Sequence, residues 1–229
     1  MELLEQSVWS LFREWFVRLR YPGHEHHKLT DDAPPGWTRQ RLRDLCSSVD
    51  YGYTASAVGE RVGPHFLRIT DIVGPYIEWA SVPYCQIDER KLEKFALEKG
   101  DLVVARTGAT VGYAKRINRS DLKAVFASYL VRLKPRSRSL STLMGIFMQS
   151  DLYKQYVIAN VGGAAQPNAN AHVLSNAMIL IPTDPLLEEF RNFTEPIFDQ
   201  VEVLATQIER LKSARELLLP RLMDGRISV

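Results

Sequence analysis

The sequence lacks the features on which secreted and membrane proteins depend. Its 229 residues include only two cysteines, Cys46 and Cys85, which lie far apart and form no CxxC pair. We therefore expect buried thiols in a reducing compartment and no disulfide framework. No apolar run approaches the ~20 residues that a bilayer span needs, and the first residues do not resemble a secretory signal. These absences predict a cytoplasmic protein with no membrane partner.

Recognisable catalytic motifs are also missing. The sequence contains no GxSxG elbow, P-loop, GxGxxG or HExxH. Residues 32–35 (Asp-Ala-Pro-Pro) superficially resemble the Pro-Pro motif of amino-methyltransferases, but no aromatic residue follows the prolines directly and no cofactor loop accompanies them. His24, His26 and His27 have no matching ligand set at metal-binding spacing. We expect a non-catalytic chain that needs neither a metal nor a cofactor.

The sequence also has little excess of positive over negative charge, because its net charge is only +2. Any affinity for nucleic acid must then come from a local patch and not from the global field. The apolar content of 45% is ordinary for a globular protein, so the chain can bury a core.

The most regular pattern lies at the end of the chain, in residues 183–229. Asp184 is a candidate helix cap, and Pro185 fits the first helical position. A helix over 185–219 would be roughly 50 Å long at about 1.5 Å per residue. Pro196 predicts a kink or a separate first turn, and Pro220 predicts an end or a bend.

Apolar residues in this segment recur with a heptad period. The a positions are Thr194, Val201, Ile208 and Arg215, and the d positions are Ile197, Leu204, Leu211 and Leu218. An apolar a/d seam with polar flanks is typical of a helix that packs along another helix. This favours a coiled-coil-forming spacer or docking arm. The alternative is an amphipathic helix packed on its own domain.

The rest of the chain predicts an α+β fold. Residues 1–22 carry an apolar stripe that predicts an N-terminal helix ending at Tyr21-Pro22-Gly23. In the globular mixed-sheet domain expected over residues 23–182, strands are predicted at 66–72, 101–105, 111–117, 124–133 and 177–181, and helices at 41–47, 140–148 and 152–161. The long C-terminal helix occupies the third region, 183–229.

Polar loops interrupt this middle region at residues 51–57, 106–112 and 162–170. They carry Arg, Gln and Asn, which make bidentate contacts to base edges, together with hydroxyls and glycine amides that serve phosphates. Further cations could supply a backbone-contacting patch: Lys115, Arg116, Arg119, Lys123, Lys134, Arg136 and Arg138. The alternatives are ordinary Gly-rich turns, capping asparagines and a solvated cationic surface.

The order of several motifs resembles the specificity subunit of type I restriction-modification systems. The Tyr-Gly-Tyr-Thr loop (51–54), Arg-Ile-Thr-Asp-Ile (68–72), Ala-Arg-Thr-Gly-Ala-Thr-Val-Gly (105–112) and Gln-Pro-Asn-x-Asn (166–170) are similar to signatures of that family's target recognition domain. Residues 11–17, 186–189 and 219–227 are similar to parts of its conserved helical regions. Family members normally carry two recognition domains, whereas this chain has one. It therefore resembles a half-size subunit, either natural or a piece of a longer one.

The resemblance implies a sequence-specific subunit that binds double-stranded DNA and performs no catalysis itself. Two chains would pair through antiparallel helices as a homodimer and dock two modification (methyltransferase) subunits. Whether a restriction subunit joins them stays open. A two-fold dimer should recognise an interrupted palindrome, and base flipping would belong to the methyltransferase.

These considerations select two groups of residues. The expected DNA-facing residues are Tyr51, Tyr53, Thr54, Arg68, Arg106, Thr107, Thr110, Lys115, Gln166, Asn168 and Asn170. The expected partner-helix residues are Ile197, Val201, Leu204, Ile208, Leu211 and Leu218. Gly52, Gly108, Gly112, Gly162 and Gly163 are expected to shape loops.

An alternative function is a helical assembly adaptor whose head binds a protein or small ligand. Salt sensitivity separates the two functions, because phosphate contacts weaken steeply as salt rises.

Overall fold

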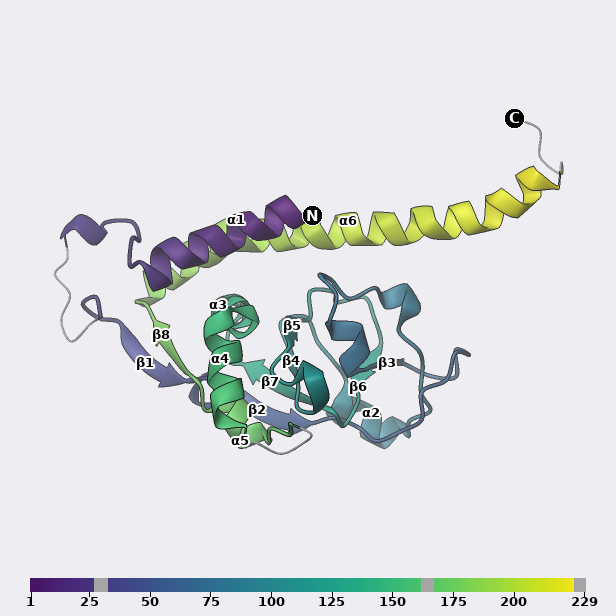
Figure 1. Cartoon of the computed structure of the whole chain (residues 1–229), viewed down its shortest axis with the longest axis horizontal. Helices are drawn as coiled ribbons and strands as arrows, with labels where there is room; N and C mark the ends of the chain where they lie inside the picture. The colour runs from purple at the N-terminus through teal and green to yellow at the C-terminus, as the bar shows by residue number, and fades with distance from the viewer. Residues whose placement is uncertain (27–32, 162–166, 225–229) are drawn as a thin grey trace.

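A long helix lies along one side of a mixed α+β head (Figure 1). The structure is a computed structural model that describes residues 1–26, 33–161 and 167–224. We call residues 33–183 the head and the long helix α6 (Asp184–Met223) the stalk. The other helices are α1 (Glu2–Phe12), α2 (Glu89–Phe95), α3 (Arg138–Gln149), α4 (Asp151–Asn160) and α5 (Ala171–Ser175).

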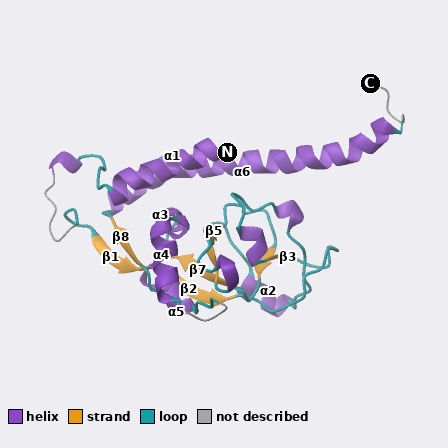
Figure 2. Ribbon diagram, in the orientation of Figure 1, coloured by secondary structure: helices purple, strands orange, loops and turns teal. Residues whose placement is uncertain are grey.

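The strands are short and fall into separate sheets. They are β1 (Thr38–Arg41), β2 (Cys46–Tyr51), β3 (His65–Leu67), β4 (Leu102–Ala105), β5 (Ala114–Arg116), β6 (Ala124–Phe126), β7 (Leu130–Pro135) and β8 (Met178–Ile181). The largest sheet is antiparallel, in the order β2-β7-β4-β5, and two-stranded sheets pair β1 with β8 and β3 with β6 (Figure 2). Only the β3–β6 pair is parallel among these ladders.

The head's core lies against the central strand β4, whose four residues are all buried. α3 packs on β5 and β7 and also on the stalk. α1 continues as a π-helical turn (Arg13–Val17) and runs beside the beginning of the stalk (Figure 1). There Phe190 is fully buried, with its ring centroid 5.5 Å from that of Trp15 and 4.8 Å from that of Phe16.

Several predicted strands are shorter than the sequence pattern indicated. The pattern over 124–133 forms two strands, β6 and β7, because the chain turns at Ala127–Tyr129. Only residues 65–67 of the predicted 66–72 strand are extended, and a 3-10 turn (Ile69–Ile72) follows. Within 111–117 only β5 is a strand, and 41–47 forms a 3-10 turn (Leu42–Leu45) between two strands. Short apolar runs fit both a strand and a buried turn, so periodicity alone does not distinguish them.

The stalk also differs from its prediction in detail. Pro196 does not separate a first turn, because the helix is continuous from Asp184 to Met223 and buries Thr194 and Val201 on either side of the proline. Pro220 lies inside the helix, close to its end. The N-cap position is Thr183, without a side-chain bond, and Asp184 belongs to the first turn. None of the described helices combines the length and the apolar character that a bilayer crossing requires.

Candidate nucleic-acid interface

Two loops that are far apart in sequence lie side by side at the end of strand β4. Thr107 and Asn168 form an antiparallel β-bridge. The Gly108 amide donates to the Pro167 carbonyl at 3.0 Å, and the Ala169 amide donates to the Arg106 carbonyl at 2.8 Å. These backbone bonds hold the loop that follows β4 against the segment that precedes α5.

Among the described residues of these two loops, Arg106 is the only cation. Its guanidinium carbon lies 4.9 Å from the centroid of the Tyr51 ring, and Nη2 donates to Oδ1 of Asn168 at 3.3 Å. Its buried Nε has no hydrogen-bond acceptor among the described residues, and no described carboxylate pairs with the guanidinium. Stacking on an aromatic ring fixes the plane of a guanidinium while leaving its charge uncompensated. The Arg106 guanidinium is thus held in place by Tyr51 and Asn168, and its charge has no acidic partner among the described residues.

The neighbouring polar residues support this arrangement. The Tyr51 hydroxyl accepts a hydrogen bond from the Ala171 amide at 2.9 Å. Oδ1 of Asn170 accepts from the Val173 amide at 2.8 Å and so caps α5. Asn168 and Asn170 are both exposed. Figure 1 shows α5 on the side of the head opposite the stalk, so this cluster faces away from α6.

Glycines permit the close approach of these loops. Gly108 and Gly112 have φ of +74° and +85°, a region that glycine adopts without strain. A Cβ on Gly52 would lie 2.2 Å from the Ala127 carbonyl oxygen, which no other residue type would tolerate. Gly162 and Gly163 lie outside the described residues.

The structure does not bring every expected DNA-facing residue to this cluster. Arg68 makes a bidentate pair with Asp71, with contacts of 3.0 and 2.8 Å, that holds a 3-10 turn. The Tyr53 ring packs 5.2 Å from that of Phe95, next to the exposed Thr54. Thr107 belongs to the cluster, whereas Gln166 lies outside the described residues.

Lys115 and Thr110 have different surroundings. The Lys115 ammonium donates to the Pro75 carbonyl at 2.6 Å, and burial lowers its pKa. It lines a small cavity with Glu5 of α1 and Phe198 of the stalk, and Arg106 is not among the lining residues. The Thr110 hydroxyl is buried without a described partner.

Three cations of the expected patch pair with carboxylates of the chain. Arg116 and Arg119 bind glutamates of the stalk, and Lys134 binds Glu98 at 2.9 Å. Their charges are therefore largely compensated inside the chain. The sequence could not show this, because the partner carboxylates are many residues away.

Two residues beside the cluster were missed by the sequence reasoning. The Tyr129 side chain is 59% exposed, and its carbonyl accepts from the Arg106 amide at 3.0 Å. The pattern over 124–133 predicts one continuous strand through Tyr129, whereas residues 128–129 form a turn. Nη1 of Arg43 lies 3.1 Å from Nδ1 of His172 on α5. Arg43 comes from a segment predicted only as a short helix.

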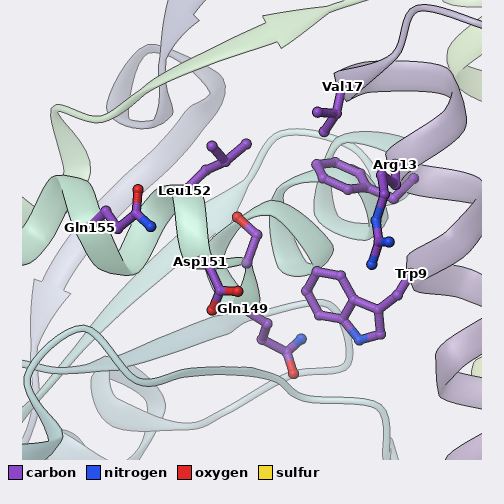
Figure 3. Close-up of a pocket in the computed structure, with 9 residues that line it drawn as sticks. Trp9, Arg13, Val17, Gln149, Asp151, Leu152 and Gln155 are labelled. Atoms are coloured by element: carbon purple, nitrogen blue, oxygen red, sulfur yellow. The ribbon is translucent and has the colours of Figure 1, made fainter.

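The structure also contains a groove of about 400 Å³ between α1 and α4 (Figure 3). Trp9, Arg13 and Val17 line one wall, and Asp151, Leu152 and Gln155 line the other. The described residues hold no group of three or more His, Cys, Asp or Glu placed to bind a metal.

The comparisons with known proteins agree on one kind of protein. The type I restriction enzyme MjaIX specificity subunit of Methanocaldococcus jannaschii is 25% identical over 239 residues, covering 100% of this chain and 54% of that protein. The solved HsdS subunit from Thermoanaerobacter tengcongensis has a TM-score of 0.53 at 22% identity, over 96% of this chain and 49% of that chain. The type I restriction-modification S subunit from M. genitalium also has a TM-score of 0.53, at 16% identity, over 85% of this chain and 47% of that chain.

No family model matches the sequence. The chain spans about half the length of the relatives it matches. The resemblance to type I specificity subunits is confirmed by the curated relative, and the α+β fold with a long C-terminal helix is confirmed by the solved structures.

Proposed function

We propose that this chain is a non-catalytic, DNA-sequence-recognising specificity subunit of a type I restriction-modification complex. The carrying observation is the Arg106 cluster, in which a cation stacked on Tyr51 and bonded to Asn168 has no acidic partner among the described residues. Arg and Asn are the side chains that recognise guanine and adenine edges in the major groove. The likeness to a protein named a type I specificity subunit, over 100% of this chain and 54% of that protein, supports the same function.

In this proposal the recognition domain expected over residues 23–182, whose described part belongs to the head, recognises one half-site. Tyr51, Arg106, Thr107, Asn168 and Asn170 form the described part of the interface, and we keep Gln166 in it from its sequence motif. Thr54 and Thr110 are secondary candidates. The side chains of Tyr53, Arg68 and Lys115 contact other residues of the chain, and these contacts favour structural roles for them.

The stalk, within residues 183–229, and the N-terminal helix, within residues 1–22, would carry the assembly contacts. Two copies pairing as a homodimer would present two heads at a fixed separation and recognise an interrupted palindrome. Methyltransferase subunits, and a restriction subunit where one is present, would dock on the stalk and the N-terminal helix of this homodimer. Adenine extrusion and methyl transfer are then the partner's chemistry.

The experiment is to co-express the chain with its cognate methyltransferase subunit in an unmethylated host and to map methylated adenines. We expect two inverted half-sites at one spacing. Arg106→Ala and Asn168→Ala should weaken or relax the half-site, each by about 1–3 kcal/mol of base discrimination, while co-purification with the methyltransferase persists. Lys154→Ala, which removes a cation from α4 outside the cluster, is the matched control.

Three results would point elsewhere. An asymmetric bipartite site would mean that a different chain supplies the second head. Co-purification without any methylation would favour an adaptor function, especially if binding is insensitive to salt. Unfolding of the head in either variant would mean that the Arg106 cluster is structural.

A further inference from the structure

A row of glutamates runs along the stalk at intervals of seven residues. Its members are Glu188, Glu195, Glu202, Glu209 and Glu216. Seven residues are nearly two helical turns, so such a row drifts by only ~20° per step and stays on one face of the helix. The row is adjacent to the apolar a positions, of which Thr194 and Val201 are buried.

The second glutamate is bound by a buried arginine of strand β5. Nη2 of Arg116 donates to both carboxylate oxygens of Glu195, at 2.8 and 2.9 Å, and the Arg116 side chain is only 4% exposed. The Thr142 hydroxyl of α3 donates to the same carboxylate at 2.8 Å. A Cβ on Gly145 would lie 3.2 Å from Cδ of Arg116, so this glycine of α3 leaves the space that the arginine occupies. The Glu195 site is therefore built from two elements of the head.

The next two glutamates share one cation. Nε of Arg119 lies 3.5 Å from Glu202, and its Nη1 lies 3.4 Å from Glu209. Asp121 holds the same guanidinium at 2.9 Å, and the Arg119 side chain is 13% exposed. Oε1 of Glu209 also accepts from the Ala80 amide at 3.4 Å. The Arg119 guanidinium thus connects two successive glutamates of the row to the head.

The two ends of the row define its extent. At the beginning, the Ser139 hydroxyl of α3 donates to Glu188. At the other end, Glu216 is exposed and has no hydrogen-bond or ion-pair partner among the described residues. The contacts therefore reach from Glu188 to Glu209, a span of roughly 32 Å along the helix axis. The glutamate row is engaged only where the head lies beside the stalk.

Apolar packing alone would leave the stalk poorly oriented, because hydrophobic contact is not directional. Hydrogen-bonded charge pairs are directional, and rotating the helix by one residue would remove every glutamate from its partner. Buried polar groups of this kind are weak evidence for stability and are best attested as devices that fix register.

We propose that Glu188, Glu195, Glu202 and Glu209, bound by Ser139, Arg116, Thr142 and Arg119, are positioning residues that fix the register and angle of the head on the stalk. If the proposed function holds, this row also sets the spacing between half-sites that the homodimer accepts. Each added base pair moves a half-site by about 3.4 Å, so a head of fixed angle accepts few spacings.

The first test measures the geometry without DNA. Spin labels are placed at two exposed serines, Ser56→Cys on the head and Ser213→Cys on the stalk, and the labelled chain is diluted into unlabelled chain. Cys46 and Cys85 are buried, and burial raises the pKa of both thiols, that of Cys46 to about 12, so they resist labelling. The variant is Glu195→Gln/Glu202→Gln/Glu209→Gln.

We expect the unsubstituted row to give one narrow distance distribution and the triple variant a broad or shifted one. The control is Glu189→Gln/Glu216→Gln, which removes from the same helix two exposed carboxylates that pair with no described residue and should leave the distribution narrow. If the triple variant does not fold, Glu202→Gln/Glu209→Gln keeps the buried Arg116 pair and matches the control in charge. A narrow, unshifted distribution in a folded row variant overturns the proposal.

The second test uses duplexes that carry the half-sites from the methylation map at spacings one to three base pairs shorter or longer. We expect the unsubstituted chain to lose about tenfold or more in affinity away from its preferred spacing, and the row variant to lose less than about threefold. A variant that keeps the full spacing preference overturns the role in spacing. If the unsubstituted chain binds no specific duplex, the proposed function fails, and the distance measurement still decides whether the row positions the head.

Discussion

The two parts of the stalk have the same heptad pattern and different surroundings. In the proximal part, 184–210, Phe190, Thr194, Val201 and Ala205 are buried against the head or α1. In the distal part, every residue from Leu211 to Asp224 is exposed. The exposed apolar residues there are Leu211, Leu217, Leu218, Leu219, Leu222 and Met223. The apolar residues of the proximal part therefore pack inside the molecule, whereas those of the distal part form an exposed apolar surface.

The comparison changes the sequence-based assignment of the partner-helix residues. Val201 is buried and lies with Ile77 and Trp79 beside a small cavity under the stalk. Ile197, Leu204 and Ile208 are half-buried, whereas Leu211 and Leu218 are exposed. The proximal part is an amphipathic helix packed on its own domain, which is the alternative that the heptad pattern left open. The distal part alone keeps an exposed apolar surface on which another helix could dock.

The largest difference between the two parts should appear on truncation of their apolar side chains. Phe190→Ala removes a fully buried ring and should cost about 3–5 kcal/mol of unfolding free energy. Leu218→Ala, on the exposed part, should stay within about 0.5 kcal/mol at protein concentrations where no partner is bound. Urea denaturation followed by circular dichroism measures both values. Equal costs would mean that the distal helix is covered in solution.

A second large effect concerns the buried ion pairs along the proximal part, whereas the distal part has an exposed pair between Lys212 and Glu78. Arg116→Met leaves Glu195 without its main partner in a buried setting and should cost about 3–5 kcal/mol. Arg116→Met/Glu195→Met should recover much of that loss, because the unpaired charge is removed as well. A double variant as unstable as the single one would show that packing, and not charge, is lost.

Substitutions in the distal part should change the association of two chains and leave the folding stability of each chain nearly unchanged. Leu211→Glu/Leu218→Glu adds charges to the exposed apolar surface, so we expect the dissociation constant of a homodimer to rise by about 10–100-fold. Monomer stability should change by less than about 0.5 kcal/mol. Sedimentation over a range of protein concentrations measures the association. Matched Gln substitutions at Glu189 and Glu216 control for surface changes, and unaltered association would place the dimer contact elsewhere.

The smallest effect is a pH dependence confined to the proximal part. Burial raises the pKa of Glu202 above its usual value, although Arg119 acts in the opposite direction. A carboxyl with a higher pKa in the folded state binds more protons folded than unfolded, so its contribution to stability increases as pH falls from 7 toward about 4.5. Glu202→Gln removes this dependence.

The stability of the unsubstituted chain relative to Glu202→Gln should therefore rise over that pH range, and the rise should be the smallest of these effects because Arg119 opposes the effect of burial. Unfolding midpoints at several pH values, with Glu216→Gln measured in parallel, provide the check. A difference that falls with decreasing pH would mean that Arg119 dominates the environment of Glu202.

The candidate interface shows how far the sequence could lead. Polar loops with Arg106, Asn168 and Asn170 were predictable, because glycines and amides stand out between apolar strands. That Arg106 stacks on Tyr51 and bonds Asn168 was not predictable, because 62 residues separate Arg106 from Asn168 and tertiary contacts alone join them. Lys115 had the same sequence appearance as an interface cation, yet its ammonium is bound by the Pro75 carbonyl.

The sequence by itself determined the α+β character, the long terminal helix, the positions of the polar loops and the likeness to type I specificity subunits. These depend on local periodicity, on turn residues and on motif order, all of which are properties of adjacent residues. The tertiary structure alone decided which part of the stalk is covered and which cations remain uncompensated. It also joined the glutamate row to the head, because burial and ion pairing depend on residues that folding brings together from distant parts of the chain.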